Sequence, residues 1–143
     1  MSRAEAHAFF ASYRDHFNRL DGDAVANLWN ACSGIAHASS SDGHGVCTMW
    51  PDDAPMRNNM RALCDAYRKS GYAHAEFQIE KHEAMGANHA FSVLHWRLYR
   101  SDDSLLQAFH TGYQLLRTAQ GIRVLLATQY EEDIDAMKNH ATH

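Results

Sequence analysis

The sequence has 143 residues, of which 45% are hydrophobic and 21% charged, proportions typical of one globular domain rather than a disordered or fibrous chain. A net charge of −4, scattered arginines and the lack of an apolar run near the ~20 residues that span a bilayer exclude nucleic-acid and membrane proteins from the expected classes. The three cysteines have no C-x-x-C spacing, so we expect reduced thiols in a cytoplasmic protein.

The first 30 residues predict two helices in tandem. Ser2 and Glu5 have the spacing of a capping box, which predicts a helix start. Aromatic and aliphatic residues then recur with helical periodicity and predict one buried side: Phe9, Phe10, Tyr13, Phe17 and Leu20. Asp21 or Asp23 can cap a second, short helix, whose apolar side is formed by Val25, Leu28 and Trp29.

Residues 33–50 predict a strand (SGIAHA), an exposed polar loop (SSSDGHG) and a second strand (VCTMW). A third helix follows, because Pro55 suits a first helical turn and Gly71 suits a helix stop. Between them an apolar stripe at helical spacing faces the predicted core: Met56, Met60, Leu63, Cys64 and Tyr67.

From Gly71 to Tyr130 the pattern predicts four consecutive antiparallel strands, with turns at 86–88, 102–104 and 119–121. Helices followed by such a meander indicate an α+β domain with the helices on one face of a sheet. The segment NHAFSVLHWRLYRS alternates between two faces that are both partly apolar. We therefore expect a homodimer through the outer face, at Phe91, Val93, His95, Tyr99 and Leu125.

The segments YRDHFNRLDGDAVANLW, SGIAHA and GYQLLRTAQGIRVLLATQY, together with the third helix, resemble the nuclear transport factor 2-like superfamily. Its SnoaL-like polyketide cyclase and ketosteroid-isomerase-like branches are the most similar. The resemblance implies one domain over residues 1–143, with its core at about 5–132 and a tail at 133–143. The implied fold is a cystatin-like α+β roll, in which a curved antiparallel, mixed sheet wraps as a cone around three N-terminal helices and a mostly apolar cavity.

The resemblance also assigns faces to the last two strands. It implies that eight side chains point into the cone: Phe109, Thr111, Tyr113, Leu115, Val124, Leu126, Thr128 and Tyr130. Five others are implied to point outward: His110, Gln114, Arg123, Leu125 and Gln129. The implied ligand pocket consists of five of the inward residues, three tryptophans and one methionine: Trp29, Trp50, Met60, Trp96, Phe109, Thr111, Tyr113, Thr128 and Tyr130.

In the steroid isomerases a tyrosine of the first helix helps to form an oxyanion hole and an aspartate of the first strand moves the proton. By resemblance these positions fall on Tyr13 and His37, whereas the third acid of the isomerases is missing near Thr111. A neutral imidazole can act as a base at pH 7. The alternative is that Tyr13 is an ordinary core residue and His37 an exposed one.

A metal site is the second arrangement to weigh. His37, Asp42, His44 and Cys47 lie close together in the sequence, but their spacing matches no closed metal motif, so we expect neither metal nor cofactor.

Two functions stay open. One is a cofactor-independent isomerase, dehydratase or cyclase acting on a small apolar, carbonyl-bearing molecule; the other is a non-catalytic ligand-binding or association domain.

Overall fold

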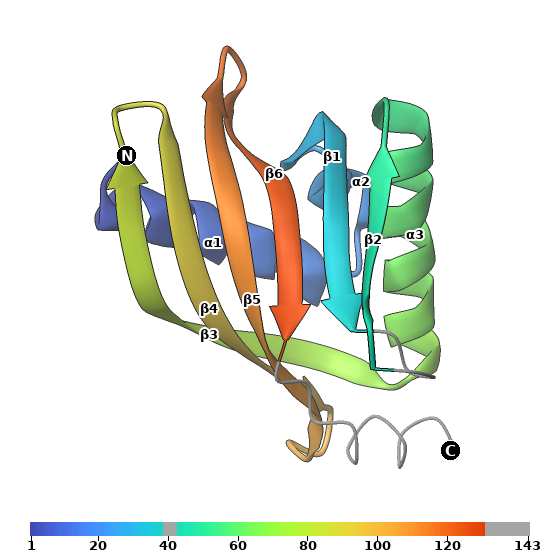
Figure 1. Cartoon of the computed structure of the whole chain (residues 1–143). Coiled ribbons are helices and arrows are strands. Elements are labelled where there is room, and N and C mark those ends of the chain that lie inside the picture. The colour runs from blue at the N-terminus through green and yellow to red at the C-terminus, as the bar shows by residue number, and fades with distance from the viewer. Residues whose placement is uncertain (39–42, 131–143) are drawn as a thin grey trace.

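Three helices lie on one face of a curved six-stranded sheet (Figure 1). The computed structural model describes residues 1–38 and 43–130. The helices are α1 (Arg3–Asn18), α2 (Gly22–Ala26) and α3 (Asp53–Lys69). The strands are β1 (Trp29–Ala38), β2 (Gly45–Trp50), β3 (Tyr72–Met85), β4 (His89–Arg100), β5 (Leu105–Thr118) and β6 (Gly121–Tyr130). The predicted tail and residue Asp42 of the predicted loop lie outside the described residues.

The helices begin at their predicted signals, but the first two end earlier than predicted. Helix α1 ends at Asn18, before Leu20, and α2 ends at Ala26, so Leu28 and Trp29, expected on its apolar side, lie beyond it and Trp29 opens β1. The Ser2 hydroxyl accepts the Glu5 N–H at 3.1 Å, and the Glu5 carboxylate accepts the Ser2 N–H at 3.1 Å, which completes the capping box of α1. Asp21 caps α2 by accepting the Ala24 N–H at 3.0 Å. After α3, Gly71 takes a φ of 84°, a conformation that glycine adopts without steric cost. Local chemistry thus explains where α1 and α2 begin and where α3 stops.

The strands follow the order β2-β1-β6-β5-β4-β3. The last four form the predicted antiparallel meander, and the sheet is mixed because β1 pairs in parallel with β6. The first strand begins at Trp29, four residues before the predicted start at Ser33. In Figure 1, β3 sweeps across the lower end of the sheet before it rises at the edge, so the sheet wraps around the helices. The predicted α+β fold is confirmed.

The core lies between the helices and the concave face of the sheet. Strand β4 has the predicted alternation, with its inner side chains at most 4% exposed: Ala90, Ser92, Leu94, Trp96 and Leu98. On its outer face, Phe91 is 39% exposed.

In the part of the chain that the structure describes, no helix combines the length and the apolar character that crossing a membrane requires.

Irregular pairing near Leu125 corrects part of the predicted face assignment. In the pairing of β5 with β6, Gln114 is opposite Leu126 and Leu115 is opposite Val124. This leaves Leu125 as one extra residue in β6. Such a bulge moves every following side chain to the opposite face. Leu126, Thr128 and Tyr130 were predicted to point inward, but Leu126 pairs with the outward-facing Gln114, and Thr128 and Tyr130 are exposed. Gln129 was predicted to point outward and instead lines the interior.

Candidate functional site

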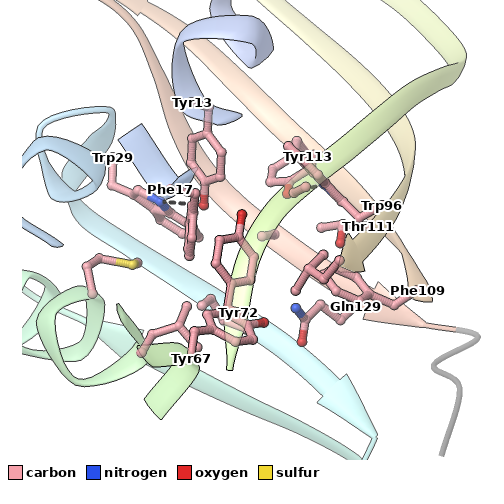
Figure 2. Close-up of a pocket in the computed structure, with 16 residues that line it drawn as sticks. Tyr13, Phe17, Trp29, Tyr67, Tyr72, Trp96, Phe109, Thr111, Tyr113 and Gln129 are labelled. Atoms are coloured by element: carbon pink, nitrogen blue, oxygen red, sulfur yellow. Dashed lines mark hydrogen bonds between the residues drawn. The ribbon is translucent and has the colours of Figure 1, made fainter. Parts of the chain in front are cut away.

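An aromatic cavity of about 60 Å³ lies between α1, α3 and the concave face of the sheet (Figure 2). Seven of the residues discussed as site candidates from the sequence line it: Tyr13, Trp29, Met60, Trp96, Phe109, Thr111 and Tyr113. One water needs roughly 10–15 Å³ of such space, and a cavity of about 150 Å³ holds benzene. The space therefore admits only a few non-hydrogen atoms unless its wall adjusts.

Two tyrosine–tryptophan pairs contribute polar groups to the wall. The Trp29 indole donates its Nε1–H to the Tyr13 hydroxyl at 3.3 Å, and the Trp96 indole donates to the Tyr113 hydroxyl at 2.9 Å. The rings of the two tyrosines lie 6.2 Å apart. An indole can only donate, so each phenol oxygen acts as the acceptor and keeps its own O–H available to donate. The pairs approach the cavity from different sides in Figure 2.

Burial keeps both tyrosines protonated. Tyr13 and Tyr113 are 5% and 4% exposed. Desolvation is the main cause that raises the pKa of each phenol well above its ordinary value, and the indole hydrogen bonds offset this only partly. At neutral pH each hydroxyl is therefore a hydrogen-bond donor and not a base.

The Thr111 hydroxyl lies at the same wall and is 1% exposed. It has no hydrogen bond of standard geometry to any described residue, although it is near enough to Tyr113 to oppose the rise in that residue's pKa. A buried polar atom without a full partner costs about 1–3 kcal/mol. The Thr111 oxygen is thus a further point at which a polar group inside the cavity would be stabilised.

Several lining residues were not predicted. Tyr72 lies at the start of β3, and its hydroxyl donates to Asn18 Oδ1 at 2.8 Å, so that hydroxyl joins β3 to the end of α1. Tyr67, on α3, was expected only as part of the core stripe and also lines the cavity. Gln129 is brought inward by the irregularity in β6. The stripe on α3 was a usable signal for Tyr67, whereas no local pattern indicated Gln129.

His37 does not share the cavity with Tyr13. It borders a separate shallow hollow over β1, β2 and the end of β6, together with Val46, Cys47 and Thr128. The His37 Nδ1 atom lies 2.9 Å from the carbonyl oxygen of the next residue, Ala38. Gln129 borders both the hollow and the cavity. The two predicted catalytic residues are therefore separated, and one glutamine lies between their surroundings.

The three other predicted pocket residues also lie elsewhere. Trp50 is 7% exposed and packs edge to face against Trp29, with 6.2 Å between ring centroids, so it supports the cavity wall from behind. Thr128 and Tyr130 lie on the opposite side of β6 after the irregularity, and Tyr130 stacks on His110 there. The face assignment implied by the resemblance did not include this irregularity and misplaced both residues.

Within the described residues, neither a carboxylate nor an imidazole lines the cavity. The metal ligands considered from the sequence do not gather: Asp42 lies outside the described residues, and His37, His44 and Cys47 form no ligand group. A group of potential ligands does occur on the outer face of the sheet, at Glu80, His95 and His110. The cavity itself offers hydroxyl groups, an amide and aromatic surface.

Comparison with solved structures supports this fold. An NTF2-like protein of unknown function from Shewanella oneidensis has a TM-score of 0.68 at 14% identity, over 90% of this chain and 98% of that one. A ketosteroid isomerase-like protein from Erwinia carotovora has a TM-score of 0.62 at 14% identity, over 88% and 92%. An NTF2-like protein with a cystatin-like fold from Novosphingobium aromaticivorans has a TM-score of 0.65 at 17% identity, over 89% and 79%.

No curated protein sequence matches the chain. The model of a protein family described as NTF2-like protein (DUF6841) matches residues 4–132. This range includes every described helix and strand except the first residue of α1. The chain therefore belongs to the NTF2-like family DUF6841.

Proposed function

We propose that this chain binds a small, mostly apolar molecule with a carbonyl oxygen in the cavity between the helices and the sheet. The observation that carries the proposal is the pair of hydroxyls of Tyr13 and Tyr113, each fixed by an indole donor and each with its own proton to give. A carbonyl oxygen accepts such protons, while the aromatic wall receives the apolar remainder.

The size of the cavity narrows the ligand class. At about 60 Å³ it is less than half the volume of roughly 150 Å³ that holds benzene. A steroid would have to displace several side chains of the wall, whereas a short ketone, an aldehyde or a five-membered ring needs smaller adjustments. Met60 and Gln129 belong to the wall and have unbranched, flexible side chains that suit such adjustment.

The protonation states favour binding over proton transfer. Both tyrosines retain their protons at neutral pH because burial raises their pKa. Neither a carboxylate nor an imidazole of residues 1–38 and 43–130 lines the cavity. General base catalysis needs a group within hydrogen-bond reach of the proton that it removes. A binding role for the cavity uses only the groups that are present.

The test compares two probes of nearly equal shape, cyclopentanone and methylenecyclopentane, which lacks the acceptor oxygen. Titration followed by ¹H–¹⁵N correlation spectra should show tighter binding of the ketone, with shifts concentrated around the cavity. Tyr113→Phe should weaken cyclopentanone binding by about 5- to 30-fold, the equivalent of one buried hydrogen bond, with little change for the hydrocarbon. Tyr99→Phe, on the outer face, is the matched control. Equal affinity of the wild type for both probes would refute the carbonyl assignment.

The second candidate is an isomerase, dehydratase or cyclase of the kind found in the SnoaL-like and ketosteroid-isomerase-like branches, with Tyr13 as hydroxyl donor and His37 as base. This candidate is supported by two observations. His37 lies two residues beyond Ile35, which lines the cavity, and Gln129 borders both the cavity and the hollow at His37. In D₂O an enzyme of this type should exchange the α-protons of cyclopentanone for deuterium. The exchange should disappear in His37→Gln but persist in His44→Gln. Binding without exchange would leave the non-catalytic function.

A further inference from the structure

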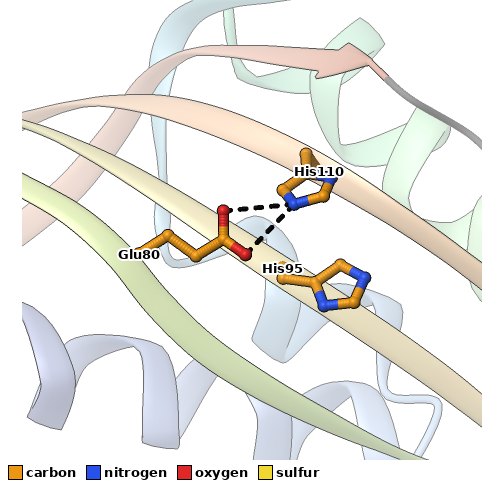
Figure 3. A group of neighbouring side chains, drawn as sticks. All are labelled: Glu80, His95 and His110. Atoms are coloured by element: carbon orange, nitrogen blue, oxygen red, sulfur yellow. Dashed lines mark hydrogen bonds and ion pairs between the residues drawn. The ribbon is translucent and has the colours of Figure 1, made fainter.

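Three potential metal ligands meet on the outer face of the sheet (Figure 3). Glu80, His95 and His110 come from three neighbouring strands, and their ligand atoms all lie within 4.8 Å of one another. His110 Nε2 is 3.1 Å and 3.2 Å from the two carboxylate oxygens of Glu80. The two imidazole rings are stacked, with 4.5 Å between centroids and 19° between planes. The three side chains thus already share one small volume.

The backbone holds this arrangement in place. His95 and His110 are direct partners in the ladder between β4 and β5, which keeps their Cβ atoms close on one face. Glu80 is the extra residue of an irregularity in β3, since Ile79 pairs with Leu94 and Lys81 pairs with Val93. A bulge of this kind changes the direction of nearby side chains and is common beside functional sites. Here it leaves the Glu80 carboxylate next to the histidine pair.

We propose that Glu80, His95 and His110 bind one divalent transition-metal ion of the zinc class. Two imidazoles and one carboxylate match the ligand types and the ligand number of open zinc sites, in which a fourth position stays available. Tetrahedral bonds of 2.0–2.2 Å place ligand atoms about 3.4 Å apart. The contact between Glu80 and His110 is already close to this separation, and His95 has to turn out of its stack with His110 to complete the set.

Exposure and charge permit an ion to enter. In the single chain, the side chain of Glu80 is 41% exposed and that of His110 is 18% exposed, so solvent reaches the group. Burial is the main cause that lowers the pKa of His95, followed by the nearby His110 and Arg97. Arg97 opposes a cation, whereas the Glu80 carboxylate attracts one. Tyr130 stacks on the far side of His110 and limits its ring orientation.

This site is independent of the proposed ligand cavity. His110 alternates along β5 with Phe109 and Thr111, which line the cavity, so its side chain lies on the other face of the sheet. Loss of the metal site would leave the tyrosine–tryptophan pairs intact. Failure of carbonyl binding would equally leave the three ligands in place.

The experiment uses the full chain, freed of metal with a chelator and titrated with ZnCl₂ by calorimetry in a buffer that does not bind metal. We expect one tight equivalent of Zn²⁺ per chain. Glu80→Gln, His95→Gln and His110→Gln should each weaken this binding at least tenfold. The matched controls are Glu83→Gln on β3 and His89→Gln on β4, which should stay within about twofold of the wild type. Affinity equal to the wild type in the triple variant would overturn the proposal.

A second measurement requires no mutation and remains decisive if a variant fails to fold. Spectra of the imidazole nitrogens of the wild type, recorded with zero and one equivalent of ZnCl₂, report which histidines bind the ion. Shifts of both His95 and His110 at one equivalent support the site. Shifts confined to other histidines of the chain, or no saturation at one equivalent, would refute it.

Discussion

The Cys64 side chain points from α3 into the core and is 1% exposed, whereas Cys32 and Cys47 are exposed. The sequence indicated three reduced thiols, and it placed Cys64 on the buried stripe of α3. Burial raises the pKa of the Cys64 thiol to about 11, because the thiolate would lose its hydration. The thiolate is the reactive form of cysteine, so position in the fold separates the three residues chemically.

We therefore expect Ellman's reagent at pH 8 to modify Cys32 and Cys47 in the native protein and to leave Cys64 unmodified. In guanidinium chloride all three thiols should react. The native variants Cys32→Ser and Cys47→Ser should each lose one reactive equivalent, and Cys64→Ser should lose none. Rapid labelling of Cys64 in the native state, detected by peptide mass spectrometry, would contradict its burial.

Between elements, an ion pair joins the first helix to strand β5. Glu5, in the first turn of α1, pairs with Arg117 near the end of β5 at 2.5 Å. The hydrogen bond from Arg117 is the main cause that lowers the pKa of Glu5 to about 2, followed by the backbone hydrogen bond of Ser2. Both contacts favour the carboxylate over the protonated acid. Folding therefore becomes less favourable when this group is protonated.

The sign of the pH dependence follows from this shift. The pKa of Glu5 falls from 4.5 to about 2 on folding, so its stabilisation is complete above pH 4.5 and is lost as the pH falls towards 2. Glu5→Gln should lower the midpoint of thermal unfolding at pH 7 and flatten its decline between pH 5 and pH 2. Glu83→Gln, at an exposed site of β3, is the control. Parallel pH curves for the wild type and Glu5→Gln would contradict the linkage.

The close approach of α2 to α3 depends on Gly22. A Cβ atom at this position would lie 2.7 Å from the Cα of Arg61 and 3.1 Å from the carbonyl oxygen of Met60. Because these are backbone atoms, the helices would have to separate. Gly22→Ala should therefore lower the free energy of unfolding by about 1–3 kcal/mol, measured by chemical denaturation. Gly45→Ala, where a Cβ atom meets nothing within 4 Å, should change it little.

At the scale of the whole molecule, the outer face of the sheet combines apolar and polar surface. Phe91 is 39% exposed and lies over Gly112, where a Cβ atom would come within 2.8 Å of its ring. Val93 is 6% exposed beside it. We propose that a second copy of the chain covers this face, with contacts at Phe91, Val93, His95, Tyr99 and Leu125, because exposed apolar surface on a sheet favours self-association.

Sedimentation velocity at micromolar concentration tests the dimer. The wild type should sediment as a dimer, and Phe91→Glu should shift it to the monomer because a carboxylate would be buried at the interface without a partner. Val46→Glu, on the edge strand β2, carries the same charge change at a similarly exposed residue and should leave the dimer intact. A monomeric wild type would refute the proposal.

Local signals in the sequence predicted the helix starts, the four-stranded meander and the inner face of β4. Capping residues, glycine at turns and a period of two act over a few residues, so they can be recognised without the fold. The resemblance to the NTF2-like superfamily implied Tyr13 as a site residue and Trp29, Trp96 and Tyr113 as pocket residues. It did not reveal which hydroxyl meets which indole, since that pairing joins residues 16 and 17 positions apart.

Other features of the fold and of the two sites depend on how the strands pair. The parallel pairing of β1 with β6, the inward turn of Gln129, the outward turn of Thr128 and Tyr130, and the place of Glu80 beside two histidines all depend on strand register. One extra residue in a strand reverses every side chain after it, and the position of that residue is set by the neighbouring strand. The local sequence predicts that side chains along a strand alternate between two faces. Pairing with the neighbouring strand decides which of them face inward, and so which residues line the cavity.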